Sequence, residues 1–205
     1  KRVVNFIENF GFTNEDITYL KSIGYEEDFL NYLKDLKFTG NIKSMQEGEI
    51  CFGNEPLLRV EAPLIQAQLI ETILLNIINF QTLIATKASR IRQIATHDTL
   101  MEFGTRRAQE IDAALWGARA AFIGGFDSTS NVRAGKLFNI PVSGTHAHAL
   151  VQTYGDEYIA FKKYAERHKN CVFLVDTFHT LKSGVPTAIK VAKELGDTIN
   201  FIGIR

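Results

Sequence analysis

The sequence predicts an α/β protein in which part of a (β/α) barrel follows part of an α+β domain. After residue 97, short apolar runs typical of buried strands alternate with helical patterns, which indicates a parallel sheet with helices outside it. Polar residues cluster directly after each apolar run, and a barrel builds its site from the carboxyl ends of its strands in this way. Before residue 63, helical patterns give way to short strand-like runs. We therefore expect one domain over 1–97 and another over 98–205.

The expected barrel elements follow one another along the chain. We expect strands at 100–103, 120–123, 140–142, 171–175 and 199–204. We expect helices at 108–118, 131–138, 149–168 and 186–195. A doubly wound sheet would also gather a ligand at this edge, but the barrel is favoured because polar residues follow all of these strands. They make about five βα units, too few to close an eight-stranded barrel, so we expect the sequence to be the central portion of a longer chain.

The first 97 residues read as helices, then a small β layer, then a long helix. Residues 13–16 are typical of a helix start. Strand-like runs lie at 38–42, 49–53 and 57–62. From Leu64, apolar residues recur every three or four positions and predict a helix that continues beyond Thr82. We interpret its basic end as a solvated face rather than a phosphate site; that end carries Lys87, Arg90 and Arg92.

Composition narrows the function classes. Lys plus Arg number 23 and Asp plus Glu also number 23, so no net field attracts nucleic acid or an anionic membrane. Residues 63–85 are apolar, but repeated Gln, Asn and Glu residues make a membrane span unfavourable. The N-terminus lacks the pattern of a signal peptide. Cys51 and Cys171 lie far apart in apolar runs, as free thiols do in a reducing cytoplasm, where we expect the protein to reside.

The most informative stretch is the corner Ser143-Gly144-Thr145, which precedes His146 and His148. We expect the Thr145 hydroxyl to cap a helix whose first turn contains both histidines. Free backbone N–H groups there favour anions and keep an imidazole neutral, ready to act as a nucleophile or base. The alternative is that either histidine is a hydrogen-bonded structural residue.

Three other loops supply polar groups after predicted strands. Arg106 and Arg107 provide guanidinium forks for a carboxylate or phosphate; we expect one to contact ligand and the other to pair with Glu102 or Glu110. The loop 124–131 could cradle phosphate, with Ser130 as the cap of the next helix. Asp176 could hold Mg²⁺ or a ribose hydroxyl, or simply cap its loop.

A metal site is an alternative interpretation of the same residues. Two histidines in H-x-H spacing, with a histidine and a carboxylate after the next strand, are donors that zinc accepts. Against this, His146 and His148 would point apart at a helix start. The residues concerned are His146, His148, Asp176 and His179.

Several ordered motifs resemble the nicotinate phosphoribosyltransferase family. They are Phe103-Gly-Thr-Arg-Arg-Ala-Gln, Gly124-Gly-Phe-Asp-Ser-Thr-Ser-Asn-Val, Val142-Ser-Gly-Thr-His-Ala-His-Ala, Leu174-Val-Asp-Thr and Asn54-Glu-Pro-Leu-Leu-Arg-Val-Glu-Ala-Pro. The resemblance covers nearly the whole sequence. It implies a type II phosphoribosyltransferase-like barrel that joins nicotinate to phosphoribosyl pyrophosphate, with ATP hydrolysis coupled through a phosphohistidine in NAD biosynthesis.

The resemblance also implies roles for individual residues. The family pattern Gly-Thr-x-Ala-His ends on the phosphorylated residue, which falls on His148. Asp176 would assist catalysis by stabilising the cationic sugar or binding its hydroxyls. Substrate contacts would come from Arg106, Arg107, Ser130, Gly144, Thr145 and Arg205. ATP and Mg²⁺ would act as co-substrate and its metal, with no resident metal, no tightly bound organic cofactor and a homodimer as the full-length assembly.

Three other functions stay open from the sequence. Another pyridine phosphoribosyltransferase would take nicotinamide or quinolinate, although the Arg106–Arg107 pair suits an acid better than an amide. A metal-dependent barrel hydrolase would use the histidine and aspartate set described above. A non-enzymatic binding module derived from a barrel is disfavoured by the many polar strand ends.

Overall fold

The computed structural model describes residues 2–204, so the expected role of Arg205 falls outside the described residues. Contacts divide the chain into two compact units, 1–140 and 141–205. Within the described part, the strands form three separate two-stranded sheets: β1-β2, β3-β4 and β5-β6. The α/β class is therefore confirmed, while the continuous barrel sheet stays a prediction.

The first unit begins with three short helices around an aromatic core. They are α1 (Arg2–Glu8), α2 (Asn14–Ser22) and α3 (Glu27–Lys34). The predicted helix start is confirmed as a capping box, in which the Thr13 hydroxyl accepts the Asp16 N–H and the Asp16 carboxylate accepts the Thr13 N–H. Leu30 and Leu33 of α3 are almost fully buried in this core.

An antiparallel hairpin follows, with β1 (Asn41–Ser44) paired to β2 (Leu58–Glu61) so that Ile42 lies opposite Val60. The strand expected at 49–53 is wrong. Ile50 and Phe52 are exposed by 78% and 72%, so this apolar run has no sheet face to bury in and forms the loop of the hairpin.

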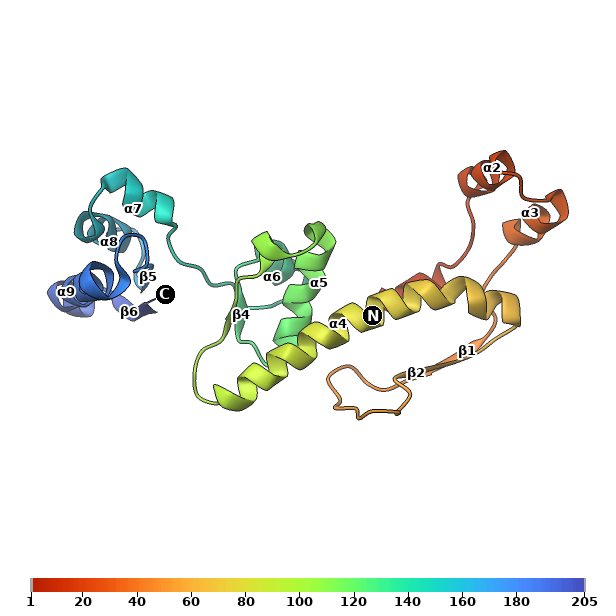
Figure 1. Ribbon diagram of the computed structural model, residues 1–205, viewed down its shortest axis with the longest axis horizontal. Coiled ribbons are helices and arrows are strands. Elements are labelled where there is room, and N and C mark those ends of the chain that lie inside the picture. Colours follow the sequence, from red (N-terminus) through yellow and green to blue (C-terminus); the bar gives the residue numbers. More distant parts are fainter. Residues whose placement is uncertain (1, 205) are drawn as a thin grey trace. The chain divides into compact units, whose positions relative to one another are not determined.

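The predicted long helix is confirmed as α4 (Leu64–Ile94). Ile70 and Leu74 pack into the core of α1–α3, and α5 (Glu110–Ile123) packs along the later part of α4 (Figure 1). By length and composition alone α4 would also suffice to cross a membrane. Its polar interruption at Gln66 is structural, because the buried Gln66 side chain accepts the Thr39 N–H at 2.9 Å.

The strand expected at 120–123 is also wrong, because these residues form the last turn of α5. Ala118, Ala120 and Ala121 are buried, and alanine is the residue that best tolerates a helix. A Cβ on Gly124 would lie 2.5 Å from the Ala85 carbonyl oxygen, so only glycine allows the end of α5 to meet α4 this closely. The strand comes later, as β4 (Ser128–Thr129), paired parallel to β3 (Met101–Glu102). The helix α6 (Val132–Phe138) then completes the first unit.

The second unit packs helices around a short parallel sheet. Helix α7 (His148–Tyr154) and helix α8 (Glu157–Ala165) replace the single helix expected at 149–168, because Gly155 ends α7 with φ +66° and Asp156 caps α8. Residues 140–142 form no regular strand. The strand β5 (Asn170–Phe173) pairs with β6 (Asn200–Ile204), and α9 (Val185–Leu195) connects them.

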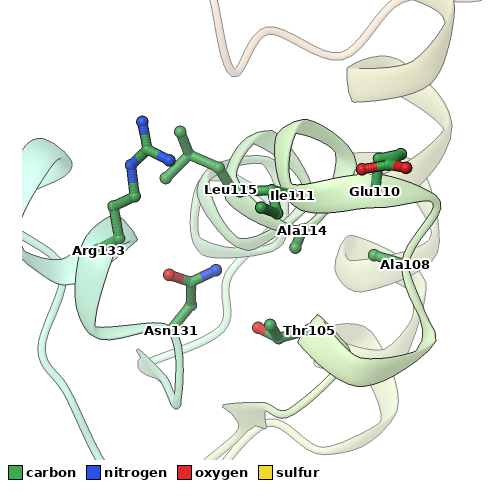
Figure 2. A pocket seen from close by; sticks show the side chains of 8 residues that line it. All are labelled: Thr105, Ala108, Glu110, Ile111, Ala114, Leu115, Asn131 and Arg133. Atoms are coloured by element: carbon green, nitrogen blue, oxygen red, sulfur yellow. The ribbon is translucent and has the colours of Figure 1, made fainter.

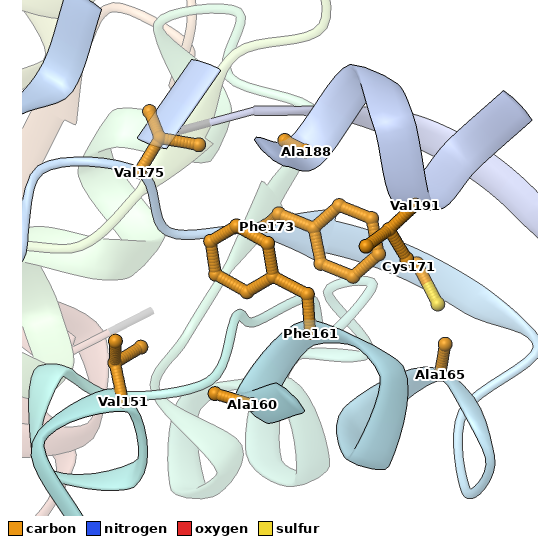
Figure 3. Packing of buried hydrophobic residues seen from close by; sticks show 9 residues of the cluster. All are labelled: Val151, Ala160, Phe161, Ala165, Cys171, Phe173, Val175, Ala188 and Val191. Carbon is orange, nitrogen blue, oxygen red and sulfur yellow. The ribbon is translucent and has the colours of Figure 1, made fainter. Parts of the chain in front are cut away.

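The core of this unit is built on two stacked phenylalanines, Phe161 of α8 and Phe173 of β5, with ring centroids 4.9 Å apart (Figure 3). Val175 and Ala188 complete it from the end of the β5 run and from α9. The backbone that leaves this core at Asp176 is thereby fixed.

Candidate active site

The structure brings His148 together with two consecutive residues that follow β5. The His148 Nδ1 atom lies 3.0 Å from the Thr177 hydroxyl, and its Nε2 atom lies 3.7 Å from Oδ1 of Asp176. The His148 and Asp176 side chains are 41% and 53% exposed, so both can meet a ligand from solvent. An imidazole flanked by a carboxylate and a hydroxyl is an arrangement suited to a nucleophile or a general base.

His146 has a different environment, although it is only two residues away. Its side chain is 6% exposed, its Nε2 atom accepts the Leu174 N–H at 3.1 Å, and its ring packs against Phe161, Tyr164 and Phe173. Burial lowers the pKa of His146 below its ordinary value of 6.5. His146 is therefore a structural residue that joins the corner to the β5 core.

The expectation that both histidines lie in a first turn capped by Thr145 is wrong. Helix α7 begins at His148, and the Thr145 hydroxyl donates to the His146 carbonyl at 2.9 Å instead. Ala147, which follows the buried His146, has an extended backbone (φ −98°, ψ 159°), so the helix can begin only after it. Gly144 remains exposed, and a Cβ there would meet no atom within 4 Å, so the backbone at this corner is open to a ligand.

The zinc interpretation is not favoured by the geometry. The Nε2 atom of His146 is already used inside the core, and the Nδ1 atom of His179 accepts the Lys182 N–H at 3.3 Å. Within residues 2–204, no group of three His, Cys, Asp or Glu side chains is placed to hold a metal ion.

In the first unit, Arg106 and Arg107 lie in a 3₁₀ turn, Thr105–Arg107, that follows β3. Both are exposed, and neither forms an ion pair with another described residue. The expected pairing of one of them with Glu102 or Glu110 is therefore wrong, and Glu102 turns inward to accept the Gly104 N–H and the Thr129 hydroxyl. Both guanidinium groups are therefore available to an anionic ligand.

The loop after α5 differs from expectation at its cap. The Asn131 side chain accepts the Ala134 N–H at 3.0 Å and caps α6, whereas the Ser130 N–H donates to the Glu102 carbonyl. Ser130 is thus placed beside β3 and next to the Gly104–Arg107 turn. Because asparagine and serine cap helices about equally well, the sequence alone could not distinguish the two positions.

A cavity of about 430 Å³ lies beside this turn (Figure 2). Polar groups from the 3₁₀ turn and from α6 face apolar residues of α5. Glu110, at its rim, has φ +68°, a left-handed conformation that is unusual for a residue with a side chain. The lining residues are Thr105, Ala108, Glu110, Ile111, Ala114, Leu115, Asn131 and Arg133. Sequence reasoning included Asn131 in the loop 124–131 but missed Arg133, which lies in the first turn of α6.

The basic end of α4 is partly structural. Arg92 donates to three carbonyl groups, those of Gly125, Ala95 and Asp98, and forms an ion pair with Asp127 at 2.5 Å. It therefore ties the end of α4 to the loop before β4 and is not free to bind phosphate. Lys87 and Arg90 are exposed, as expected for a solvated face.

A pH dependence of stability follows from His146. In the unfolded state His146 binds a proton near pH 6.5, whereas in the folded state it binds one only at a lower pH. The contribution of neutral His146 to the free energy of unfolding is therefore complete above pH 6.5 and is lost as the pH falls through the lowered pKa. We expect thermal melting and amide exchange at Leu174 to show this loss. Leaving the buried Leu174 N–H without an acceptor costs about 1–3 kcal/mol.

The matched variant is His146→Gln, which can keep an acceptor near Leu174 but does not titrate. It should flatten the pH dependence of the free energy of unfolding below pH 6.5. An unchanged slope in His146→Gln would contradict the assignment.

The chain was compared with known proteins. The family model described as the nicotinate phosphoribosyltransferase (NAPRTase) N-terminal domain matches residues 1–79, and the model of the NAPRTase family matches residues 99–184. A nicotinate phosphoribosyltransferase of Bacillus subtilis is 68% identical over 206 residues, covering 100% of this chain and 42% of the relative. The human nicotinate phosphoribosyltransferase is 38% identical over 156 residues, covering 74% of this chain and 29% of the relative.

Solved structures are also similar to the chain. The human nicotinic acid phosphoribosyltransferase gives a TM-score of 0.82 at 29% identity, covering 98% of this chain and 51% of that one. A nicotinate-nucleotide pyrophosphorylase from Pyrococcus furiosus gives a TM-score of 0.71 at 33% identity, covering 79% and 41%. The chain spans less than half the length of the curated relatives named above.

Proposed function

Because the chain belongs to the nicotinate phosphoribosyltransferase family, we propose that it is the phosphohistidine-bearing part of an enzyme that joins nicotinate to phosphoribosyl pyrophosphate. ATP hydrolysis would be coupled to this reaction, and the products would be nicotinate mononucleotide and pyrophosphate. The observation that carries the proposal is the exposed His148 ring beside Asp176, at the end of the β5 run. The enzyme would serve NAD biosynthesis.

The anionic substrates need cationic partners, and the first unit offers them. Nicotinate carries a carboxylate, which an arginine fork binds through two parallel hydrogen bonds. Arg106 and Arg107 are exposed and unpaired by other described side chains, which supports their assignment to this role. Ser130, Gly144 and Thr145 would contribute further substrate contacts, and Arg205 is a third candidate for the carboxylate.

Asp176 would act on the ribose. Departure of pyrophosphate leaves positive charge on the sugar, and a carboxylate stabilises such charge or binds the ribose hydroxyls. Mg²⁺ would arrive with ATP and pyrophosphate as part of the substrates, and the exposed carboxylate of Asp176 is a ligand of the type that Mg²⁺ accepts. A phosphoryl group on His148 would alter the relative affinities for substrates and products, which allows ATP to drive the synthesis.

The finer architecture belongs to the same proposal. Residues 98–205 would form the first part of a type II phosphoribosyltransferase barrel, and residues 1–97 part of the preceding α+β domain. The parallel pairs β3-β4 and β5-β6 support this, because a barrel is built from such pairs. The full-length protein would be a cytoplasmic homodimer without nucleic-acid or membrane partners.

The direct test is synthesis of nicotinate mononucleotide by the full-length protein, with and without ATP. Product formation that ATP stimulates is the expected result, and no product from nicotinate under either condition would contradict the proposal. Nicotinamide and quinolinate should be offered in parallel, because one similar structure bears the name of a nicotinate-nucleotide pyrophosphorylase. A preference for quinolinate would reassign the chain within the pyridine phosphoribosyltransferases.

The arginine assignment makes a separate prediction. Lysine at position 106, 107 or 205 keeps the charge but loses the two-pronged fork, so one of the three variants should bind nicotinate about ten- to a hundred-fold more weakly while its affinity for phosphoribosyl pyrophosphate is unchanged. Arg90→Lys on the exposed side of α4 is the control. If all three variants bind nicotinate like the wild type, the carboxylate is held elsewhere.

A further inference from the structure

The Thr177 hydroxyl forms a hydrogen bond with the His148 ring. The hydroxyl oxygen lies 3.0 Å from Nδ1, a normal hydrogen-bond length, whereas the Asp176 carboxylate lies 3.7 Å from Nε2. A threonine hydroxyl can donate or accept, so the distance alone leaves the tautomer open. The Asp176 carboxylate faces Nε2 and so favours the ring proton on that nitrogen.

We propose that Thr177 is a positioning residue for His148, whose hydroxyl donates to Nδ1 and so keeps the ring proton on Nε2, toward Asp176. This inference deepens the proposed function and, for its catalytic consequence, rests on it. Asp176 and Thr177 then orient the ring together, because Asp176 faces its Nε2 atom and Thr177 its Nδ1 atom.

The His148 ring needs these polar contacts because packing against other side chains does not fix its orientation. The His148 side chain is 41% exposed, and α7, which it begins, has only seven residues. The backbone that carries Thr177 is by contrast well fixed: Leu174 and Val175 are 4% and 2% exposed, and Gly184 packs directly on the Val175 carbonyl. A rigid strand end therefore supplies the orientation that the exposed ring lacks.

The tautomer has a chemical consequence. With the proton on Nε2, the lone pair of Nδ1 forms the new bond to the γ-phosphorus of ATP while the bond from that phosphorus to the bridging oxygen breaks, and ADP leaves with that electron pair. The ring becomes a cation that keeps its Nε2 proton, and the Asp176 carboxylate stabilises the new charge. The Thr177 hydroxyl must leave the lone pair of Nδ1 as the phosphoryl group arrives, and because its oxygen lies 3.0 Å from that nitrogen, the whole side chain turns about its Cα–Cβ bond.

The test compares three variants of the full-length protein. Thr177→Val keeps the shape of the side chain but removes the hydroxyl, and Thr177→Ser restores it. Thr153→Val is the matched control, because the exposed Thr153 hydroxyl donates to the Ala149 carbonyl of its own helix, α7. Two quantities are measured: the rate of phosphorylation by γ-labelled ATP, and the ring ¹⁵N resonances of His148, assigned by their loss in His148→Asn.

Thr177→Val should phosphorylate about three- to ten-fold more slowly, the effect of losing one hydrogen bond. Its His148 resonances should shift from a defined Nε2–H tautomer toward a mixture. Thr177→Ser and Thr153→Val should resemble the wild type in both measurements. A wild-type ring with its proton on Nδ1, or a Thr177→Val variant with an unchanged tautomer, would overturn the proposal.

The two measurements separate this proposal from the proposed function. If the wild type takes no label from ATP, the phosphohistidine step is wrong, yet the resonances still decide whether Thr177 positions the ring. If the wild type is labelled and Thr177→Val is labelled equally fast with an unchanged ring, the positioning role alone fails.

Discussion

Replacing His148 with asparagine is expected to abolish labelling by γ-labelled ATP and the stimulation of synthesis by ATP. Asparagine keeps part of the hydrogen bonding toward Thr177 but has no nitrogen that can carry a phosphoryl group. Some synthesis without ATP should survive, because the proposed substrate-binding arginines lie on another part of the chain. The label on the wild-type protein should be lost in acid and kept in base, as phosphohistidine chemistry requires.

The second histidine of the corner provides the control. His146→Gln can preserve the contact with the Leu174 N–H, so the variant should fold and keep both the labelling and the ATP stimulation. If His146→Gln loses the label and His148→Asn retains it, the roles of the two histidines are exchanged. If both variants retain it, neither histidine carries the phosphoryl group.

The contrast between these two histidines shows what local sequence could not predict. Both follow the same small-residue corner, and residue type alone gives them equal claims. They differ because the backbone conformation changes between them: His146 precedes the helix and its ring packs into the Phe161–Phe173 core, whereas His148 is the first residue of α7 and its side chain is 41% exposed. Only the tertiary packing around β5 makes one a structural residue and the other a candidate nucleophile.

Elements with strong periodicity or a local cap were predicted well. The rhythm from Leu64 gives α4, and the capping box at Thr13 gives α2, because each signal lies within the element itself. The apolar run at 120–123 was misassigned because a short apolar run does not distinguish a strand from a buried helix end. Residues 120–123 form a helix because alanine favours helices and because Gly124 allows the end of α5 to pack closely against α4.

The sequence predicted which residues belong to the site better than it predicted their contacts. The rule that polar groups gather after strands led to Asp176 and His148, which the structure places 3.7 Å apart at their nearest charged atoms. The Gly104–Arg107 turn was also expected to pair one of its two arginines with Glu102 or Glu110, but Glu102 instead accepts the Gly104 N–H and the Thr129 hydroxyl. Hydrogen bonds between adjacent strands compete for each carboxylate, and that competition is invisible in a single sequence.

Gly184→Ala is expected to destabilise the second unit by about 3 kcal/mol or more, because a Cβ at this position would lie 1.9 Å from the Val175 carbonyl oxygen. The obstruction is backbone on both sides, so no side chain can rotate to relieve it. Gly184 ends the π-helical turn Thr180–Gly184, which lies between Asp176 and α9. Any shift that accommodates the methyl group must therefore move the strand end that carries Asp176 and Thr177.

Chemical denaturation and phosphorylation by ATP should be measured together for this variant. Gly203→Ala in β6 is the matched control, since a Cβ there meets no atom within 4 Å and its φ is not in the left-handed region. We expect the free energy of unfolding of Gly203→Ala to lie within about 0.5 kcal/mol of the wild-type value. Gly184→Ala should lose both stability and labelling by ATP. A Gly184→Ala protein of wild-type stability would show that the π-helical turn does not pack against Val175. It would also contradict the argument that this packing fixes the backbone that carries Thr177.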